Sequence, residues 1–271
     1  MRQLVRLSGP LSLVLASLGG LAAFLYPFLL PAFGIEPARG NQLAVPLLFA
    51  VLALLSVAVL VSEVLQAEQH RGDAARFVAL LAVLVALDAA LRFVPSFIGA
   101  SPIFPLIILS GYVFGARFGF AMGALTLLVS AILTGGIGPW LPYQMLCAGW
   151  IGQSAGWLPK RQGWPRRLLL AAFGATWGFL FGALMNLWFW PFVAPGVTES
   201  AGLYWTPGMS LVETVRAYAR FYLATSLLFD GTRAIGNAVL LLLLGDPLCV
   251  ILERWRLRLS WYPWQPLDET G

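Results

Sequence analysis

The sequence predicts an all-α integral membrane protein on the basis of its composition, its long apolar runs and the placement of its basic residues. Of its 271 residues, 59% are hydrophobic and 11% are charged, whereas soluble proteins carry about 25% charged residues. Long apolar runs alternate with short polar segments, as in helices that cross about 30 Å of hydrocarbon with about 20 residues. The formal net charge of +5 comes from basic residues between these runs, which indicates membrane orientation more than nucleic-acid binding.

Eight membrane spans are predicted, with both termini on the cytoplasmic side. In chain order they cover residues 11–33, 43–65, 75–94, 103–115, 118–135, 140–158, 168–191 and 216–245. The apolar run after Arg2 and Arg6 is too long for the core of a signal peptide, so we expect it to be retained as the first span. The fourth span is short for a full crossing, and the last one is long.

The basic residues support this count, because most of them fall in the predicted inner segments. They are Arg71, Arg76, Arg117, Lys160, Arg161, Arg166, Arg167, Arg254, Arg256 and Arg258. The predicted outer side holds Arg39, with Arg92 and Arg216 at span ends, so the asymmetry follows the positive-inside rule. The polar segment 66–76 separates two N-terminal helices from a six-helix core. The predicted parts are therefore residues 1–70, 71–260 and a short cytoplasmic tail, 261–271.

Small residues recur at fourfold spacing near the centre of the predicted core. Around the junction of the fourth and fifth spans they are Gly111, Gly115, Gly119 and Gly123. The sixth span repeats the pattern at Ala148, Gly152 and Gly156. This spacing places small residues on one helix face, which lets two helix backbones approach closely. We therefore expect the core to be built on close contacts between these spans.

The third span carries a one-sided alanine face that includes Ala82, Ala86 and Ala90. Asp88 and Arg92 point the opposite way and are four residues apart, so they are predicted to pair within the helix. A smooth alanine face suits close contact with another helix. The pattern itself leaves open whether that helix belongs to this chain or to a partner protein.

Polar side chains inside the later spans mark a candidate site. Ser226, Asp230, Arg233 and Asn237 share one face of the last span. Ionisable residues within a span usually face the bundle interior or a wet cavity. Asp230 and Arg233 are therefore interpreted either as a structural salt bridge or as part of a substrate pocket.

Aromatic and amide side chains gather at the predicted outer ends of the sixth and seventh spans. They are Trp140, Tyr143, Gln144, Asn186 and Trp188. Tryptophan and tyrosine at this depth commonly anchor a helix at the membrane interface. The amides need hydrogen-bond partners, and together with flat aromatic rings they would also suit a pocket for a ring-containing solute.

Signals of an enzyme are weak. Residues 152–156 read Gly-Gln-Ser-Ala-Gly, which matches a nucleophile elbow by letter. That motif requires a strand-to-helix turn and a histidine base, whereas these residues fall in a predicted helix and the single histidine is His70. No Walker A motif is present in the sequence. We predict no catalytic residue, metal site or cofactor, and any uphill transport would need ions or a partner for its energy.

Besides the alanine-rich third span, three runs stand out in the core: LSGYVFGARFG at 109–119, GIGPWLPYQM at 136–145 and GALMNLWFWP at 182–191. On these features the six-helix core, residues 75–258, resembles the substrate-specific (S) components of energy-coupling factor (ECF) transporters. The resemblance implies an S-component-like core of six helices, so the two leading spans are an addition to the minimal pattern.

The resemblance also implies a function. S components capture a vitamin or similar micronutrient outside the plasma membrane and work with a transmembrane coupling (T) subunit and two cytoplasmic ATPase subunits. In this chain the T-subunit contact would map to Ala82, Ala86 and Ala90. The pocket would map to Trp140, Tyr143, Gln144, Asn186 and Trp188, and less directly to Asp230 and Arg233.

The substrate and the rival functions stay open at this stage. Similar sequences point to cobalamin or a related corrinoid, while a smaller ring vitamin fits the aromatic residues equally well. The alternatives are a stand-alone secondary transporter, a membrane enzyme that acts on lipid or isoprenoid substrates, and a structural membrane subunit.

Overall fold

The computed structural model is all-α over the residues that it describes, which are 2–29, 33–34, 50, 54, 73–94, 101–192 and 202–259. Its helices are α1 (Arg2–Leu29), α3 (Asp73–Leu91), α4 (Ile103–Phe114), α5 (Ala116–Thr134), α6 (Leu141–Ala155), α7 (Gly163–Phe189), α8 (Leu211–Thr225) and α9 (Leu227–Leu259). A short 3-10 turn, η2 (Trp190–Phe192), follows α7. Nearly all of the predicted second span and the whole tail at 261–271 lie outside the described residues.

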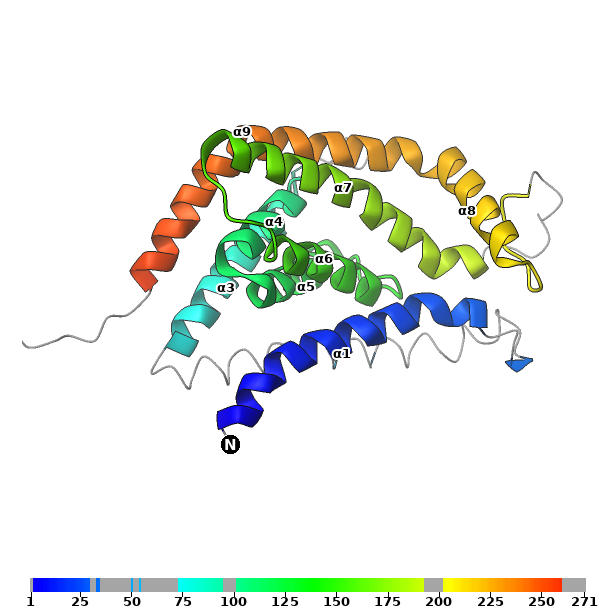
Figure 1. The fold of residues 1–271 in the computed structure, drawn as a ribbon, viewed down its shortest axis with the longest axis horizontal. Coiled ribbons are helices and arrows are strands. Elements are labelled where there is room, and N and C mark those ends of the chain that lie inside the picture. The colour runs from blue at the N-terminus through cyan, green and yellow to red at the C-terminus, as the bar shows by residue number, and fades with distance from the viewer. Residues whose placement is uncertain are drawn as a thin grey trace, which may run out of the picture.

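The helices form a bundle in which α7 and α9 lie side by side along one side (Figure 1). Helix α1 runs along the opposite side, and α4, α5 and α6 lie between them. Three described helical stretches are long and apolar enough to cross a membrane, namely Ala116–Thr134, Gly163–Phe192 and Leu227–Leu257. These stretches confirm a helical membrane protein, whereas the count of eight spans and the placement of the termini stay predictions.

Close contacts at glycine hold α4, α5 and α6 together. A Cβ atom on Gly152 of α6 would lie 2.0 Å from the carbonyl oxygen of Gly119 on α5. A Cβ atom on Gly111 of α4 would lie 2.0 Å from the carbonyl oxygen of Gly152. Gly115 joins α4 to α5 with a φ of 102°, a backbone conformation that residues other than glycine rarely adopt. The predicted small-residue face is therefore confirmed as a set of backbone-to-backbone contacts.

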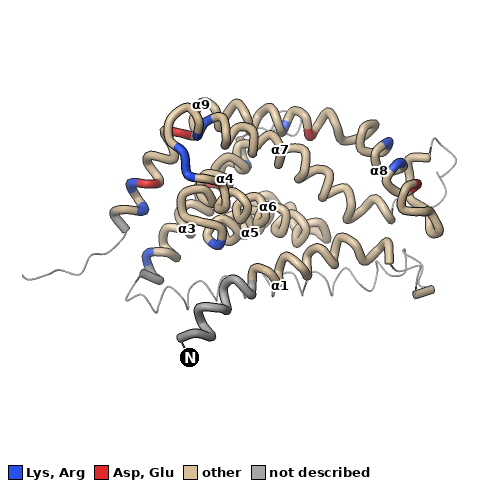
Figure 2. The backbone as a smooth tube through the Cα atoms, in the orientation of Figure 1, with Lys and Arg blue, Asp and Glu red and all other residues tan. Residues whose placement is uncertain are grey.

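Most of the described basic residues gather at one end of the bundle, which we call the basic end (Figure 2). They are Arg76, Arg117, Lys160, Arg161, Arg166, Arg167, Arg254 and Arg256. Arg166 is buried there and pairs with Asp246 and Glu253 of α9, at 2.9 Å in each case. These ion pairs tie the start of α7 to the later half of α9.

The last predicted span differs from the structure. The prediction of a single helix over 216–245 is wrong, because the helix is interrupted at Ser226, which separates α8 from the longer α9. The Thr225 hydroxyl donates to the Phe221 carbonyl at 2.8 Å, and the Ser226 hydroxyl accepts from Asn186 of α7 at 2.7 Å. Such short polar side chains compete with the helical backbone for hydrogen bonds, and here they accompany a bend that a hydropathy pattern does not show.

Helix α8 begins with a capping box between Ser210 and Glu213. The Ser210 backbone N–H donates to the Glu213 carboxylate at 2.8 Å, and this bond is the main reason that the pKa of Glu213 is lowered. The aromatic segment before α8 is also ordered: Trp205 is buried, and the Trp190 indole N–H donates to the Leu203 carbonyl at 3.0 Å. These contacts fasten the segment before α8 to the end of α7.

Substituting Gly152 tests the close packing of α5 and α6. Gly152→Ala places a methyl group against backbone atoms that cannot rotate away, so we expect a loss of about 1–3 kcal/mol in unfolding free energy. The measurement is the thermal unfolding transition of the purified protein in detergent. Gly245→Ala on α9 is the matched control, because its added methyl would meet its nearest neighbour at 3.6 Å, an ordinary contact. Equal transitions for the two variants would contradict this account of the packing.

Candidate functional site

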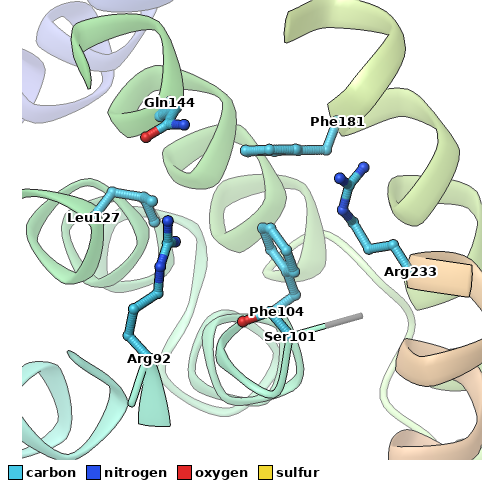
Figure 3. Close-up of a pocket in the computed structure, with 7 residues that line it drawn as sticks. All are labelled: Arg92, Ser101, Phe104, Leu127, Gln144, Phe181 and Arg233. Carbon is cyan, nitrogen blue, oxygen red and sulfur yellow. The ribbon is translucent and has the colours of Figure 1, made fainter. Parts of the chain in front are cut away.

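A cavity of about 230 Å³ lies where α3 ends and α4, α6 and α9 begin, which is the end of the bundle opposite the basic end. Its lining residues are Arg92, Ser101, Phe104, Leu127, Gln144, Phe181 and Arg233 (Figure 3). Arg92 follows α3, Ser101 precedes α4, and the other five residues lie on α4, α5, α6, α7 and α9. The cavity is therefore walled by the whole predicted six-helix core.

Two arginines point into the cavity from different walls (Figure 3). Arg233 donates to the Asp230 carboxylate at 2.5 Å and to the Gly178 carbonyl at 3.2 Å. Its guanidinium also lies over the Phe181 ring, 5.3 Å from the ring centroid. Three neighbours thus hold Arg233 in place at the cavity wall.

The Asp230 side chain is buried between α9 and α7, where Gly182 makes room for it. A Cβ atom on Gly182 would lie 1.9 Å from one carboxylate oxygen of Asp230. The ion pair with Arg233 offsets part of the cost of burying this carboxylate. Gly182 falls in one of the runs that carry the family resemblance, and the structure supplies a physical reason for a glycine there.

Arg92 sits differently from the prediction. Asp88 was predicted to pair with it within the helix, and this is wrong, because no ion pair joins the two among the described residues. The Asp88 carboxyl is fully buried, and neither of its oxygens has a hydrogen-bond partner in the described structure. Arg92 follows the last residue of α3 and turns into the cavity instead.

The apolar part of the cavity is aromatic. Phe104 of α4 and Phe181 of α7 meet edge to face, with ring centroids 4.9 Å apart and an interplanar angle of 61°. The Gln144 side chain reaches the cavity from α6 (Figure 3). The arrangement combines charged groups, an amide and flat apolar surfaces, which is the usual make-up of a site for a small organic ligand.

The structure brings some of the predicted site residues to this cavity and places others elsewhere. Gln144 and Arg233 line it, and Asp230 adjoins it through Arg233. Tyr143 instead stacks on Trp188 at 5.7 Å and packs against Phe24 of α1 at 5.0 Å. Neighbouring positions on a helix point about 100° apart, so Gln144 faces the cavity while Tyr143 faces α1.

Two further predicted residues have local partners. The Asn186 amide donates to the Ser226 hydroxyl at 2.7 Å, next to the break between α8 and α9. Trp140 is 39% exposed, and its indole N–H donates to the Gly136 carbonyl at 3.2 Å. Their roles in binding a substrate stay predictions, as do those of Tyr143 and Trp188.

Sequence reasoning missed Phe104, Phe181 and Leu127, and it treated Arg92 as a charge at a span end. The three apolar residues look like any others within an apolar helix, so no pattern singles them out. Arg92 did carry a signal, since a basic residue on the predicted outer side runs against the general asymmetry.

The predicted docking face is exposed in the structure. Ala82, Ala86 and Ala90 all lie on the outside of α3. Val83 and Leu87, on the same side, are each 52% exposed. The face is therefore free of the described helices of this chain.

A family model matches residues 76–245, more than half of the chain, and its description is "ECF transporter, substrate-specific component". The chain belongs to this family. No curated protein and no solved structure matches it. The matched segment of this S component contains all seven residues that line the cavity.

Breaking the pair between Asp230 and Arg233 tests how strongly it holds α9. Asp230→Asn leaves a nearly buried guanidinium without its counter-charge, so we expect a loss of about 3 kcal/mol in unfolding free energy. The double variant with Arg233→Gln should lose less than Asp230→Asn alone, measured by thermal unfolding in detergent. Additive losses from the two single substitutions would mean that the side chains do not interact.

Proposed function

We propose that this S component is the substrate-binding part of an ECF-type importer in the plasma membrane. It captures a small vitamin-like solute in the cavity between Arg92, Gln144 and Arg233, and it works with a T subunit and two cytoplasmic ATPase subunits. The observation that carries the proposal is that one polar cavity is walled by all six core helices within the segment that matches the family.

The orientation of the cavity supports uptake from outside. At the basic end α4 and α6 finish, and α3, α5 and α7 begin. The Phe77 and Phe118 rings meet there at 5.2 Å, and Arg256 donates to the Val113 carbonyl at 3.0 Å. Under the positive-inside rule this end faces the cytoplasm. The cavity, at the other end, then faces outside.

The cavity volume bears on the two substrate types that the sequence left open. About 230 Å³ is below the range of roughly 300–1,000 Å³ found for sites of drug-sized ligands. This favours a smaller ring vitamin. A cobalamin-type solute would require the helices around the cavity to move apart.

The alanine face of α3 supports a partner of the T-subunit kind. Its three alanines are exposed, and small residues allow a second helix to come close in a membrane, where apolar burial alone provides little driving force. We propose that Ala82, Ala86 and Ala90 form this docking face.

A bulky side chain on the alanine face should block assembly. Ala86→Trp is expected to lower the amount of T subunit and ATPases that co-purify with this protein at least tenfold, because the indole prevents close helix contact. Ala172→Trp on the exposed side of α7 is the matched control and should co-purify as the parent protein does. Normal assembly of Ala86→Trp would contradict the assigned face.

The substrate itself is tested by purification from membranes under conditions that retain bound ligand. Mass spectrometry of the co-eluting small molecules and polypeptides should find one stoichiometric vitamin-like solute together with the partner subunits. A corrinoid would show that the cavity enlarges on binding, and a smaller ring vitamin would match its present volume. Protein that carries neither ligand nor partners, even after a vitamin panel is offered, would contradict the proposed function.

A further inference from the structure

The cavity has more positive than negative charge around it. Arg92 and Arg233 both point into it, and a guanidinium stays ionised in proteins. Charged side chains in a membrane-spanning bundle are costly to keep without a counter-charge. The balance of charges at this site therefore bears on the charge of the ligand that the cavity binds.

One carboxylate adjoins the cavity, and it is committed to one arginine. Asp230 pairs with Arg233 at 2.5 Å. Asp88, the acidic residue nearest to Arg92 in the chain, is fully buried and makes no ion pair with it in the described structure. The two guanidinium groups at the cavity thus carry two positive charges, and the one carboxylate beside them is paired with Arg233. This leaves a formal excess of one positive charge at the cavity.

Arg92 is the arginine with spare hydrogen-bonding capacity. Within the described part of the chain its side chain has no ion pair and no hydrogen bond, whereas Arg233 is held by Asp230 and Gly178. A guanidinium presents its N–H groups as a planar fork that matches a carboxylate or phosphate group in two parallel hydrogen bonds. Arg92 can therefore meet an anionic group in the cavity without breaking an existing contact.

The remaining lining suits a ring attached to that group. Phe104 and Phe181 both contribute aromatic surface to the cavity, and Gln144 offers an amide that both donates and accepts hydrogen bonds. We infer that the cavity takes an organic anion: a ring-bearing solute whose carboxylate or phosphate group lies between Arg92 and Arg233. This names the substrate class of the site proposed above and rests on that proposal.

The test offers the full-length protein in detergent a defined mixture of small compounds. The mixture holds ring-bearing carboxylic acids, each with its neutral primary amide, and ring-bearing phosphate esters, each with its parent alcohol. Compounds retained after rapid desalting are identified and quantified by mass spectrometry. We expect retained compounds to be anions, with each at least tenfold above its neutral counterpart, and the relative retention of acids and esters separates carboxylate from phosphate recognition.

Arg92 is the position to vary, because it has no described side-chain partner and its loss should not disturb the fold. We expect Arg92→Gln to weaken retention of the anion about tenfold or more, since a hydrogen bond to a charged group is lost. Arg92→Lys keeps the charge and should retain part of the binding. Arg216→Gln, on the exposed surface of α8, is the matched control and should bind as the parent protein does. An unchanged thermal unfolding transition verifies that each variant is folded.

The outcomes separate this inference from the proposed function. Retention of the neutral amides or alcohols alone would overturn the inference and leave the binding function supported. Retention of an anion that is equally strong in Arg92→Gln would also overturn it. Retention of nothing by the folded parent protein would count against the proposed function itself.

Discussion

The close approach of α4, α5 and α6 at glycine is the constraint on which the rest of the structure depends. Gly111, Gly119 and Gly152 bring carbonyl oxygens to positions that a Cβ atom would occupy. In a membrane the lipid is as apolar as the side chains, so helices associate through close packing more than through burial of apolar surface. Three tightly packed helices form a rigid centre, against which α3, α7 and α9 are placed.

The cavity follows from the position of that centre. Glycine contacts draw the helices together towards the basic end, near Gly111, Gly119 and Gly152. Towards the other end larger side chains take over, and Phe104, Phe181 and Gln144 border the cavity that lies between the helices there. Arg233 is held at the cavity wall because Gly182 admits the Asp230 carboxylate. Small residues therefore serve both the packing of the bundle and the placement of a charge at its site.

The two ends of the bundle have different electrostatic designs. At the basic end the buried Arg166 is paired with both Asp246 and Glu253, so its charge is compensated within the protein and fastens α7 to α9. At the cavity the balance is incomplete, because Arg92 has no carboxylate of its own among the described residues. A paired charge stabilises the fold, whereas an unpaired one in a partly enclosed site is available to a ligand.

The sequence by itself determined the class of protein, the central contacts and the family. Composition and the length of the apolar runs specify helices in a membrane, and the fourfold spacing of glycine specifies backbone contact between them. Each of these signals can be read within a single segment of the chain. Only the tertiary structure decided which polar residues share a site. In the structure Gln144, Arg233 and Arg92 line one cavity, and Tyr143 packs against α1 instead. The last predicted span is divided at Ser226 into two helices. These features depend on how helices rotate and bend against one another, which periodicity within one helix cannot specify.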